Sequence, residues 1–278
     1  MSVIEHIRKS IIINSKNVNR ALFLCNIGLG DQIDMIGAVR YLSQFHNQIY
    51  VPCFNQNIKT LSEFYSDNSK VVLIAIDEEW YTRNWLYTSS LKGEKQYELI
   101  NYNPSDYTVV YRTGWFKQQH SDMWPDYNIP KCFYKDLDLD LSIEHSYFHI
   151  PENLESKKVY ETVKDIDYIF VHQRSSDYFT SLVTWDIDQI FTIDPNVNLY
   201  SEGHHWYDLA RNFVKRPFPH YTDTIINASE VHLVNSSFRC LAAHLPLKAS
   251  IKKCYARKTG KHIPEWTFNR YHPTSPSQ

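Results

Sequence analysis

The sequence predicts an α/β protein with two unequal domains, each built on a parallel sheet. Short β-branched and aromatic runs alternate with segments whose apolar residues recur at helical spacing. This alternation runs through residues 21–76 and again through residues 159–244, and strand–helix–strand order is typical of parallel sheets. The chain has 278 residues, 43% of them apolar, which is enough for two domains with full cores.

The first domain is expected over residues 1–155 and the second over residues 156–278. The predicted strands of the first domain are 21–25, 48–52, 71–76 and 107–112, and its helices are 31–45 and 57–65. The second domain is predicted to contain helices ending at 164, 213, 228 and 244, strands at 167–172 and 230–234, and a tail from 260 to 278. Several aromatic residues between these series indicate a packing layer or an acceptor cleft: Trp115, Phe116, Trp124, Tyr127, Phe133 and Tyr134.

Composition narrows the class of protein. The formal net charge is −2 with both signs interspersed, so a nucleic-acid partner is not favoured. The longest apolar run, residues 71–76, is too short to span a bilayer, and residues 1–9 carry charge where a signal peptide is apolar. Five widely spaced cysteines without a CxxC pair suit reduced thiols, so we expect a cytoplasmic protein of undetermined oligomeric state.

A glycine turn lies between the first predicted strand and helix. It contains Gly28 and Gly30, two of only seven glycines, and such a turn lets the backbone approach a ligand. A dinucleotide fingerprint needs a third glycine at position 33, which is Ile33, and no acid follows the second strand. A P-loop is excluded because no Gly-Lys-Ser/Thr is present.

Two carboxylates follow the glycines. Asp31 is expected at the helix start, where it acts as an N-cap or as a general base. Asp34 lies about one helical turn further on and is able to share or replace either role.

Polar residues also follow the two predicted strands of the second domain. After the strand at 167–172 come His172, Arg174 and Asp177; an arginine here suits a diphosphate, while the plainer interpretation is a surface Arg–Asp pair with a core histidine. After the strand at 230–234 come Asn235, Ser236, Ser237 and Phe238. The two serines are expected to cap the next helix, and this helix start is also a candidate diphosphate site.

Weaker candidates complete the set. Glu202, His204 and Tyr221 are possible contacts to the nucleotide or sugar. The adjacent pair His204–His205 does not have metal-ligand spacing, so no metal site is predicted there. The alternating aspartates of residues 136–140 describe a solvated strand face better than a metal-binding D-x-D site.

Three of these segments resemble glycosyltransferases. Residues 26–40 resemble the opening turn of GT-B enzymes related to heptosyltransferases, and still more the glycosyltransferase-like proteins of large DNA viruses. Residues 172–177 are similar to the donor-binding strand end of fucosyltransferase-like GT-B enzymes. Residues 226–245 are similar to the C-terminal donor-phosphate element of GT-B enzymes. The resemblance implies two Rossmann-like domains that face each other across a cleft.

The function implied is inverting sugar transfer from a nucleoside-diphosphate sugar to a glycan hydroxyl, without metal or other cofactor. In this hypothesis Asp31 or Asp34 is the base, Arg174 and Ser236/Ser237 hold the diphosphate, and His172 assists. The viral resemblance favours a UDP-sugar, with xylose the sugar suggested, and a host-cell cytoplasmic location. Two alternatives stay open: an NAD-dependent sugar-nucleotide epimerase or dehydrogenase, and a non-catalytic nucleotide-sugar-binding module.

Overall fold

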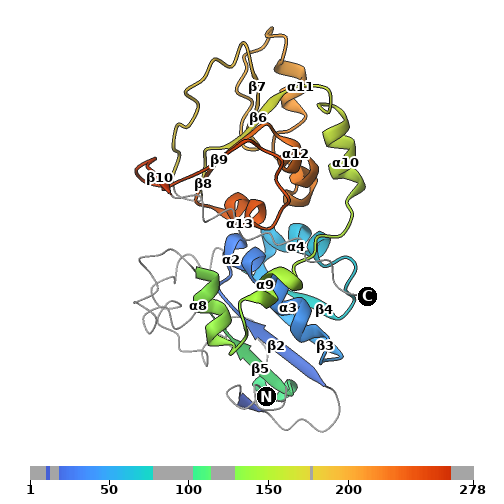
Figure 1. Ribbon diagram of the computed structural model, residues 1–278. Helices are drawn as coiled ribbons and strands as arrows, with labels where there is room; N and C mark the ends of the chain where they lie inside the picture. Colours follow the sequence, from blue (N-terminus) through green and yellow to red (C-terminus); the bar gives the residue numbers. More distant parts are fainter. Residues whose placement is uncertain (1–10, 13–18, 78–102, 114–128, 176–177, 264–278) are drawn as a thin grey trace. The chain divides into compact units, whose positions relative to one another are not determined.

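A computed structural model describes residues 11–12, 19–77, 103–113, 129–175 and 178–263 (Figure 1). The chain divides into two compact units, Met1–Pro151 and Glu152–Gln278. Each unit contains a five-stranded sheet that is parallel except for one edge strand, so the predicted α/β class with two Rossmann-like sheets is confirmed. The boundary expected between residues 155 and 156 falls inside a helix, four residues beyond this division.

The sheet of the first unit has the strand order β1-β5-β2-β3-β4. Its strands are β1 (Ile11–Ile12), β2 (Arg20–Leu24), β3 (Gln48–Phe54), β4 (Val71–Ile76) and β5 (Val109–Arg112). Strands β2 to β5 pair in parallel, and β1 pairs antiparallel to β5. One face of this sheet carries a buried apolar cluster that includes Leu22, Leu24, Ile74 and Val110. The carboxyl end of the central strand β2 is therefore held firmly.

The helices of the first unit are short. Within the described residues they are α2 (Leu29–Asp34), α3 (Ile36–Ser43), η2 (Asn55–Asn57), α4 (Ile58–Phe64), η3 (Pro104–Asp106), α8 (Ile129–Asp136) and α9 (Ser142–Ser146). The single helix predicted for residues 31–45 is wrong, because the helix breaks at Met35. The hydroxyl of Tyr134 accepts the Ala38 N–H at 3.0 Å and donates to the Asp34 carbonyl at 3.4 Å. A side chain from α8 thus stands in for one hydrogen bond of a continuous helix.

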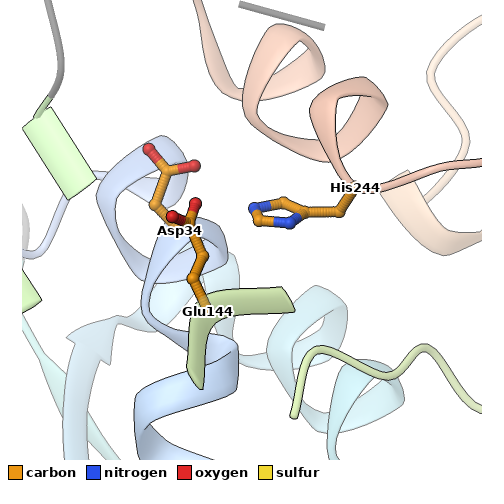
Figure 2. Close-up of side chains that lie close together, drawn as sticks. All are labelled: Asp34, Glu144 and His244. Atoms are coloured by element: carbon orange, nitrogen blue, oxygen red, sulfur yellow. The ribbon is translucent and has the colours of Figure 1, made fainter. Parts of the chain in front are cut away.

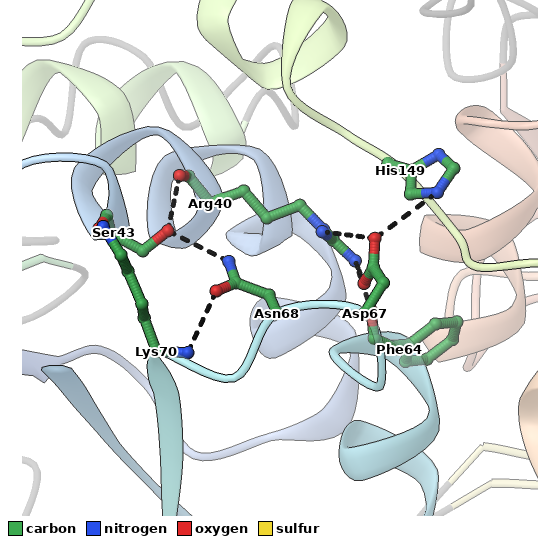
Figure 3. A network of polar contacts seen from close by, with 7 residues as sticks. All are labelled: Arg40, Ser43, Phe64, Asp67, Asn68, Lys70 and His149. Atoms are coloured by element: carbon green, nitrogen blue, oxygen red, sulfur yellow. Dashed lines mark hydrogen bonds and ion pairs between the residues drawn. The ribbon is translucent and has the colours of Figure 1, made fainter. Parts of the chain in front are cut away.

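A polar network joins α3 to the segment after α4 (Figure 3). The guanidinium of Arg40 donates to both carboxylate oxygens of Asp67, at 2.6 and 3.2 Å, and to the Phe64 carbonyl at 2.7 Å. Burial alone would raise the pKa of Asp67, but the hydrogen bonds and charge of Arg40, together with His149, hold that pKa below its usual value. This network fixes α3 to the segment after α4.

The sheet of the second unit has the order β10-β9-β8-β6-β7. Its strands are β6 (Tyr168–His172), β7 (Phe191–Ile193), β8 (Glu230–Val234), β9 (Ile251–Tyr255) and β10 (His262–Ile263); its helices are α10 (Leu154–Glu161), α11 (Tyr207–Arg211), η5 (Phe218–Tyr221), α12 (Thr222–Asn227) and α13 (Ser237–Ala243). Helix α10 begins at Asn153, whose side chain accepts the N–H groups of Glu155 and Ser156. Strands β6 and β8 are direct neighbours, so their carboxyl ends meet at one edge.

The structure also tests the predictions for the aspartates of residues 136–140 and for the aromatic residues of the middle segment. The strand face expected at residues 136–140 is wrong: α8 ends at Asp136, and Asp138 adopts a left-handed conformation with φ of 53°. Of the aromatic residues of the middle segment, Phe133 and Tyr134 are buried as a packing layer requires, and those at 115, 116, 124 and 127 lie outside the described residues. All five cysteines are buried free thiols. Among the described residues no helix has the length and apolar character needed to cross a membrane.

Candidate functional site

The glycine turn follows β2 in the first unit, at the carboxyl edge of the sheet. Gly28 is the N-cap of α2 with φ of −61°, so Asp31 lies in the first helical turn instead of capping it. A Cβ placed on Gly28 would meet nothing nearer than the Asp31 Oδ2 atom, at 3.8 Å. The fold therefore has room for a side chain at Gly28, and the glycine leaves the space beside the Asp31 carboxylate open.

Gln32 is a positioning residue that the sequence reasoning missed. Its buried amide donates to the Asn26 carbonyl at 3.2 Å, to the Pro52 carbonyl at 3.0 Å and to the Cys25 sulfur at 3.2 Å. The contact to Pro52 ties the glycine turn to the end of the neighbouring strand β3. A glutamine in a helix next to a turn carries no distinctive pattern, and only the contacts identify its role.

Cys25, at the end of β2, is not a nucleophile. Burial raises the pKa of its thiol well above the usual range, and the negative charge of Asp31 adds to the effect. The thiol is protonated at neutral pH.

The two candidate acids differ in their surroundings. Asp31 is half-buried, whereas Asp34 is 1% exposed. A carboxylate oxygen of Asp34 lies within 4.8 Å of one of Glu144, which is also 1% exposed (Figure 2). Glu144 comes from α9, in a segment without a recognisable motif, so the sequence did not indicate this pairing; His244, also drawn in Figure 2, belongs to the second unit.

Close packing holds α9 against α3 beside this acid pair. A Cβ on Gly37 would lie 2.6 Å from the Glu144 carbonyl oxygen, 2.8 Å from that of Ile143 and 2.9 Å from the Tyr134 hydroxyl.

Burial raises the pKa of Tyr134, and the nearby charges of Glu144 and Asp34 raise it further. The hydroxyl at the helix break is therefore a protonated donor.

In the second unit, the ends of β6 and β8 are joined by a hydrogen bond between the Ser236 Oγ and the His172 Nδ1, 3.0 Å apart. Ser236 is the N-cap residue of α13, but its side chain makes no capping hydrogen bond, and Ser237 is the first helical residue. The expectation that both serines cap the helix is therefore wrong. The reason is that the His172 ring engages the Ser236 hydroxyl.

His172 orders this edge of the sheet. It is 4% exposed, and its ring centroid lies 4.5 Å from that of Phe238. Burial lowers its pKa to about 3, so the ring is neutral at physiological pH. These properties favour the ordering role over direct pairing with a phosphate. Phe238 likewise packs inward, 4.1 Å from the ring of Phe218.

Arg174 follows β6 and is exposed at the same edge. It forms an isolated antiparallel bridge with Phe179, so the chain turns back directly after the strand. Asp177, the expected partner of Arg174, lies outside the described residues. On the β8 side, the Asn235 Oδ1 accepts the Arg239 Nε at 3.2 Å.

The weaker candidates lie elsewhere. The His204 ring binds the Asp188 carboxylate at 3.1 Å and accepts the Trp206 N–H, and Glu202 lies exposed in the same loop. Tyr221 is 1% exposed, and its hydroxyl serves two backbone groups. We assign His204 and Tyr221 to the fold.

The sequence matches no protein-family model, and no curated protein matches it. Solved structures that resemble its trace include the iron-containing dodecameric glycosyltransferase TibC of enterotoxigenic E. coli, with 13% identity and a TM-score of 0.45 over 86% of this chain. They also include E. coli heptosyltransferase WaaC with ADP (13% identity, TM-score 0.41, 85% of this chain and 91% of that one) and E. coli ADP-heptose heptosyltransferase II (13%, 0.46, 84% and 83%). The chain spans 58% of the length of TibC. Similarity at this level transfers no activity, substrate or partner.

Proposed function

We propose that the chain is an inverting glycosyltransferase that moves a sugar from a nucleoside-diphosphate sugar to a hydroxyl group of a glycan. The observation that carries this proposal is the polar edge of the second unit. There the adjacent strands β6 and β8 end in an exposed arginine and in two serines, one of them held by His172. Ligands of open parallel sheets bind at this edge, and an arginine with hydroxyl groups suits a diphosphate.

The proposed base is Asp31. The acceptor hydroxyl attacks the anomeric carbon, its proton passes to the Asp31 carboxylate, and the bond from that carbon to the diphosphate oxygen breaks. The half-buried position of Asp31 beside an open glycine supports this role. Asp34 is less suitable because it is buried and shares its surroundings with Glu144.

The proposed diphosphate ligands are Arg174 and Ser237. The arginine neutralises the charge that develops on the leaving nucleoside diphosphate, so we expect transfer to continue in the presence of a metal chelator. Helix α13 has only seven residues, and we therefore give the main electrostatic role to the guanidinium and not to the helix terminus. Two hydrogen bonds stabilise this edge: one joins His172 to the Ser236 hydroxyl, and the other joins Arg239 to the Asn235 side chain.

The donor base and sugar belong to the same proposal. The resemblance of residues 26–40 to viral glycosyltransferases favours UDP, with xylose the first sugar to try and a deoxyhexose such as fucose, within a glycan, as acceptor. GDP- and ADP-sugars are the comparison donors. We also infer a cytoplasmic location from the reduced cysteines.

Thermal unfolding with a ligand panel tests the proposal, because a ligand that binds the native state raises its stability. UDP, GDP, ADP and NAD are added in turn, and release of nucleoside diphosphate from the matching sugar is then measured with and without a chelator. We expect one nucleoside diphosphate to raise the Tm and its sugar to be turned over. Arg174→Ala should remove the Tm shift, and Arg211→Ala, an exposed arginine on α11, should keep it.

The rival functions give different results. A Tm shift with NAD alone would support the epimerase or dehydrogenase. Binding of a nucleoside diphosphate without turnover of its sugar would support a binding module. Either outcome contradicts the proposed transfer.

A further inference from the structure

A phenylalanine lies exposed at the same edge as Arg174. Phe179 is a large apolar side chain that is 65% exposed. It forms the antiparallel bridge with Arg174, which is also exposed. Residues directly opposite each other in an antiparallel pair point to the same face, with Cβ atoms about 5 Å apart. The two side chains therefore leave the turn after β6 on the same face.

Hydrogen bonds of the buried Gln173 hold the turn that carries this pair. The Gln173 side chain donates to the Asp194 carboxylate at 3.2 Å and accepts the Leu182 N–H at 2.8 Å, and the Gln173 carbonyl accepts the Thr180 N–H at 2.8 Å. Both Gln173 and Asp194 are 3% exposed. Asp194 directly follows β7, so the turn is held to the neighbouring strand. Phe179 is therefore presented to solvent by an anchored backbone.

A second cation, Lys258, lies near this hairpin. The Thr180 hydroxyl donates to the Arg257 carbonyl at 2.7 Å, which brings the turn after β9 against this hairpin. The Lys258 ammonium lies 5.4 Å from the ring centroid of Tyr178, the residue before Phe179. An exposed aromatic ring that shares a face of the turn with an arginine is complementary to a ligand that is flat at one end and anionic at the other.

We propose that Phe179 is the residue on which the base of a nucleoside diphosphate stacks, while Arg174 binds its phosphates. This inference rests on the proposed function and names the part of the chain that recognises the nucleoside. A sugar ring also stacks on aromatic faces, but it carries no charge for the neighbouring arginine. The pairing of ring and arginine therefore favours the nucleotide.

Equilibrium binding of UDP, GDP and ADP to the full chain tests this assignment. Phe179→Ala should weaken binding of the preferred nucleotide about tenfold, in line with the loss of one base-stacking contact. Phe179→Trp should restore it. Leu154→Ala is the matched control, because Leu154 is 68% exposed on α10 of the same unit, and it should bind as the wild type does.

Binding of inorganic pyrophosphate distinguishes the role of Phe179 from that of Arg174. Phe179→Ala should bind it as well as the wild type, and Arg174→Ala should bind both pyrophosphate and nucleotide more weakly. If Phe179→Ala binds the nucleotide with wild-type affinity, the stacking assignment is wrong while the proposed function stands. If Phe179→Ala loses binding of the glycan but not of the nucleotide, the stacking assignment is also wrong and the proposed function also stands. If the wild type binds none of the three nucleotides, both proposals fail.

Discussion

Replacing Gly37 by alanine should destabilise the first unit. The new Cβ would lie 2.6 Å from the Glu144 carbonyl oxygen and 2.8 Å from that of Ile143, where ordinary contacts begin at 3.4 Å. Both neighbours are backbone atoms, so α9 must move by about 0.8 Å away from α3. Overpacking of this kind costs about 3 kcal/mol at the upper end of its usual range, and the better helix propensity of alanine offsets about 1 kcal/mol. We expect a net loss of about 2 kcal/mol.

Urea unfolding followed by far-UV circular dichroism measures this loss. Gly28→Ala is the control, because its Cβ would have no neighbour within 3.8 Å and its φ of −61° suits alanine. It should lose less than about 1 kcal/mol, the scale of an N-cap change. It should also slow transfer several-fold, because the methyl group enters the space beside Asp31. A Gly37→Ala protein as stable as the wild type would refute the packing of α9 on α3.

Three further predictions concern stability. Tyr134→Phe should cost about 1–3 kcal/mol, because the peptide groups at the helix break lose their buried partner, and chemical denaturation would detect it. Burial lowers the pKa of His46 to about 4. The contribution of the neutral His46 ring to stability is therefore full above pH 6.5 and falls by about 3 kcal/mol as the pH drops to 4. In His46→Gln the free energy of unfolding should change less with pH over this range. Arg40→Met should destabilise the protein by leaving Asp67 without its guanidinium partner. The difference from the wild type should shrink only as the pH falls from the usual pKa of an aspartate through the lowered pKa of Asp67, where the paired carboxylate becomes protonated.

The sequence predicted the parts of the fold that local pattern determines. The strands of residues 71–76 and 230–234 have the bounds that periodicity indicated, since both are short β-branched or apolar runs between turns. Strand β9 was not predicted, because Lys252 and Lys253 interrupt its apolar pattern. The break at Met35 was not predictable either, because its cause is Tyr134, about 100 residues away in the chain.

In the candidate site, too, sequence patterns predict where residues lie but not which partners surround them. The positions of Asp31 and Arg174 follow from the rule that ligands meet the carboxyl ends of parallel strands. The partners that set their surroundings come from tertiary contacts: Glu144 beside Asp34, and His172 on the hydroxyl of Ser236. Capping rules alone assign that hydroxyl to the helix, and they cannot anticipate a competing ring from a neighbouring strand.

Transfer by an Asp31→Asn protein is the most direct test of the account. Asparagine keeps the size of the side chain but cannot take the proton from the acceptor hydroxyl, so the turnover number should fall at least about 100-fold. Nucleotide binding and the Tm should be unchanged, and Asp34→Asn should retain more activity than Asp31→Asn. An Asp31→Asn protein that folds normally and transfers sugar at the wild-type rate would contradict the central claim.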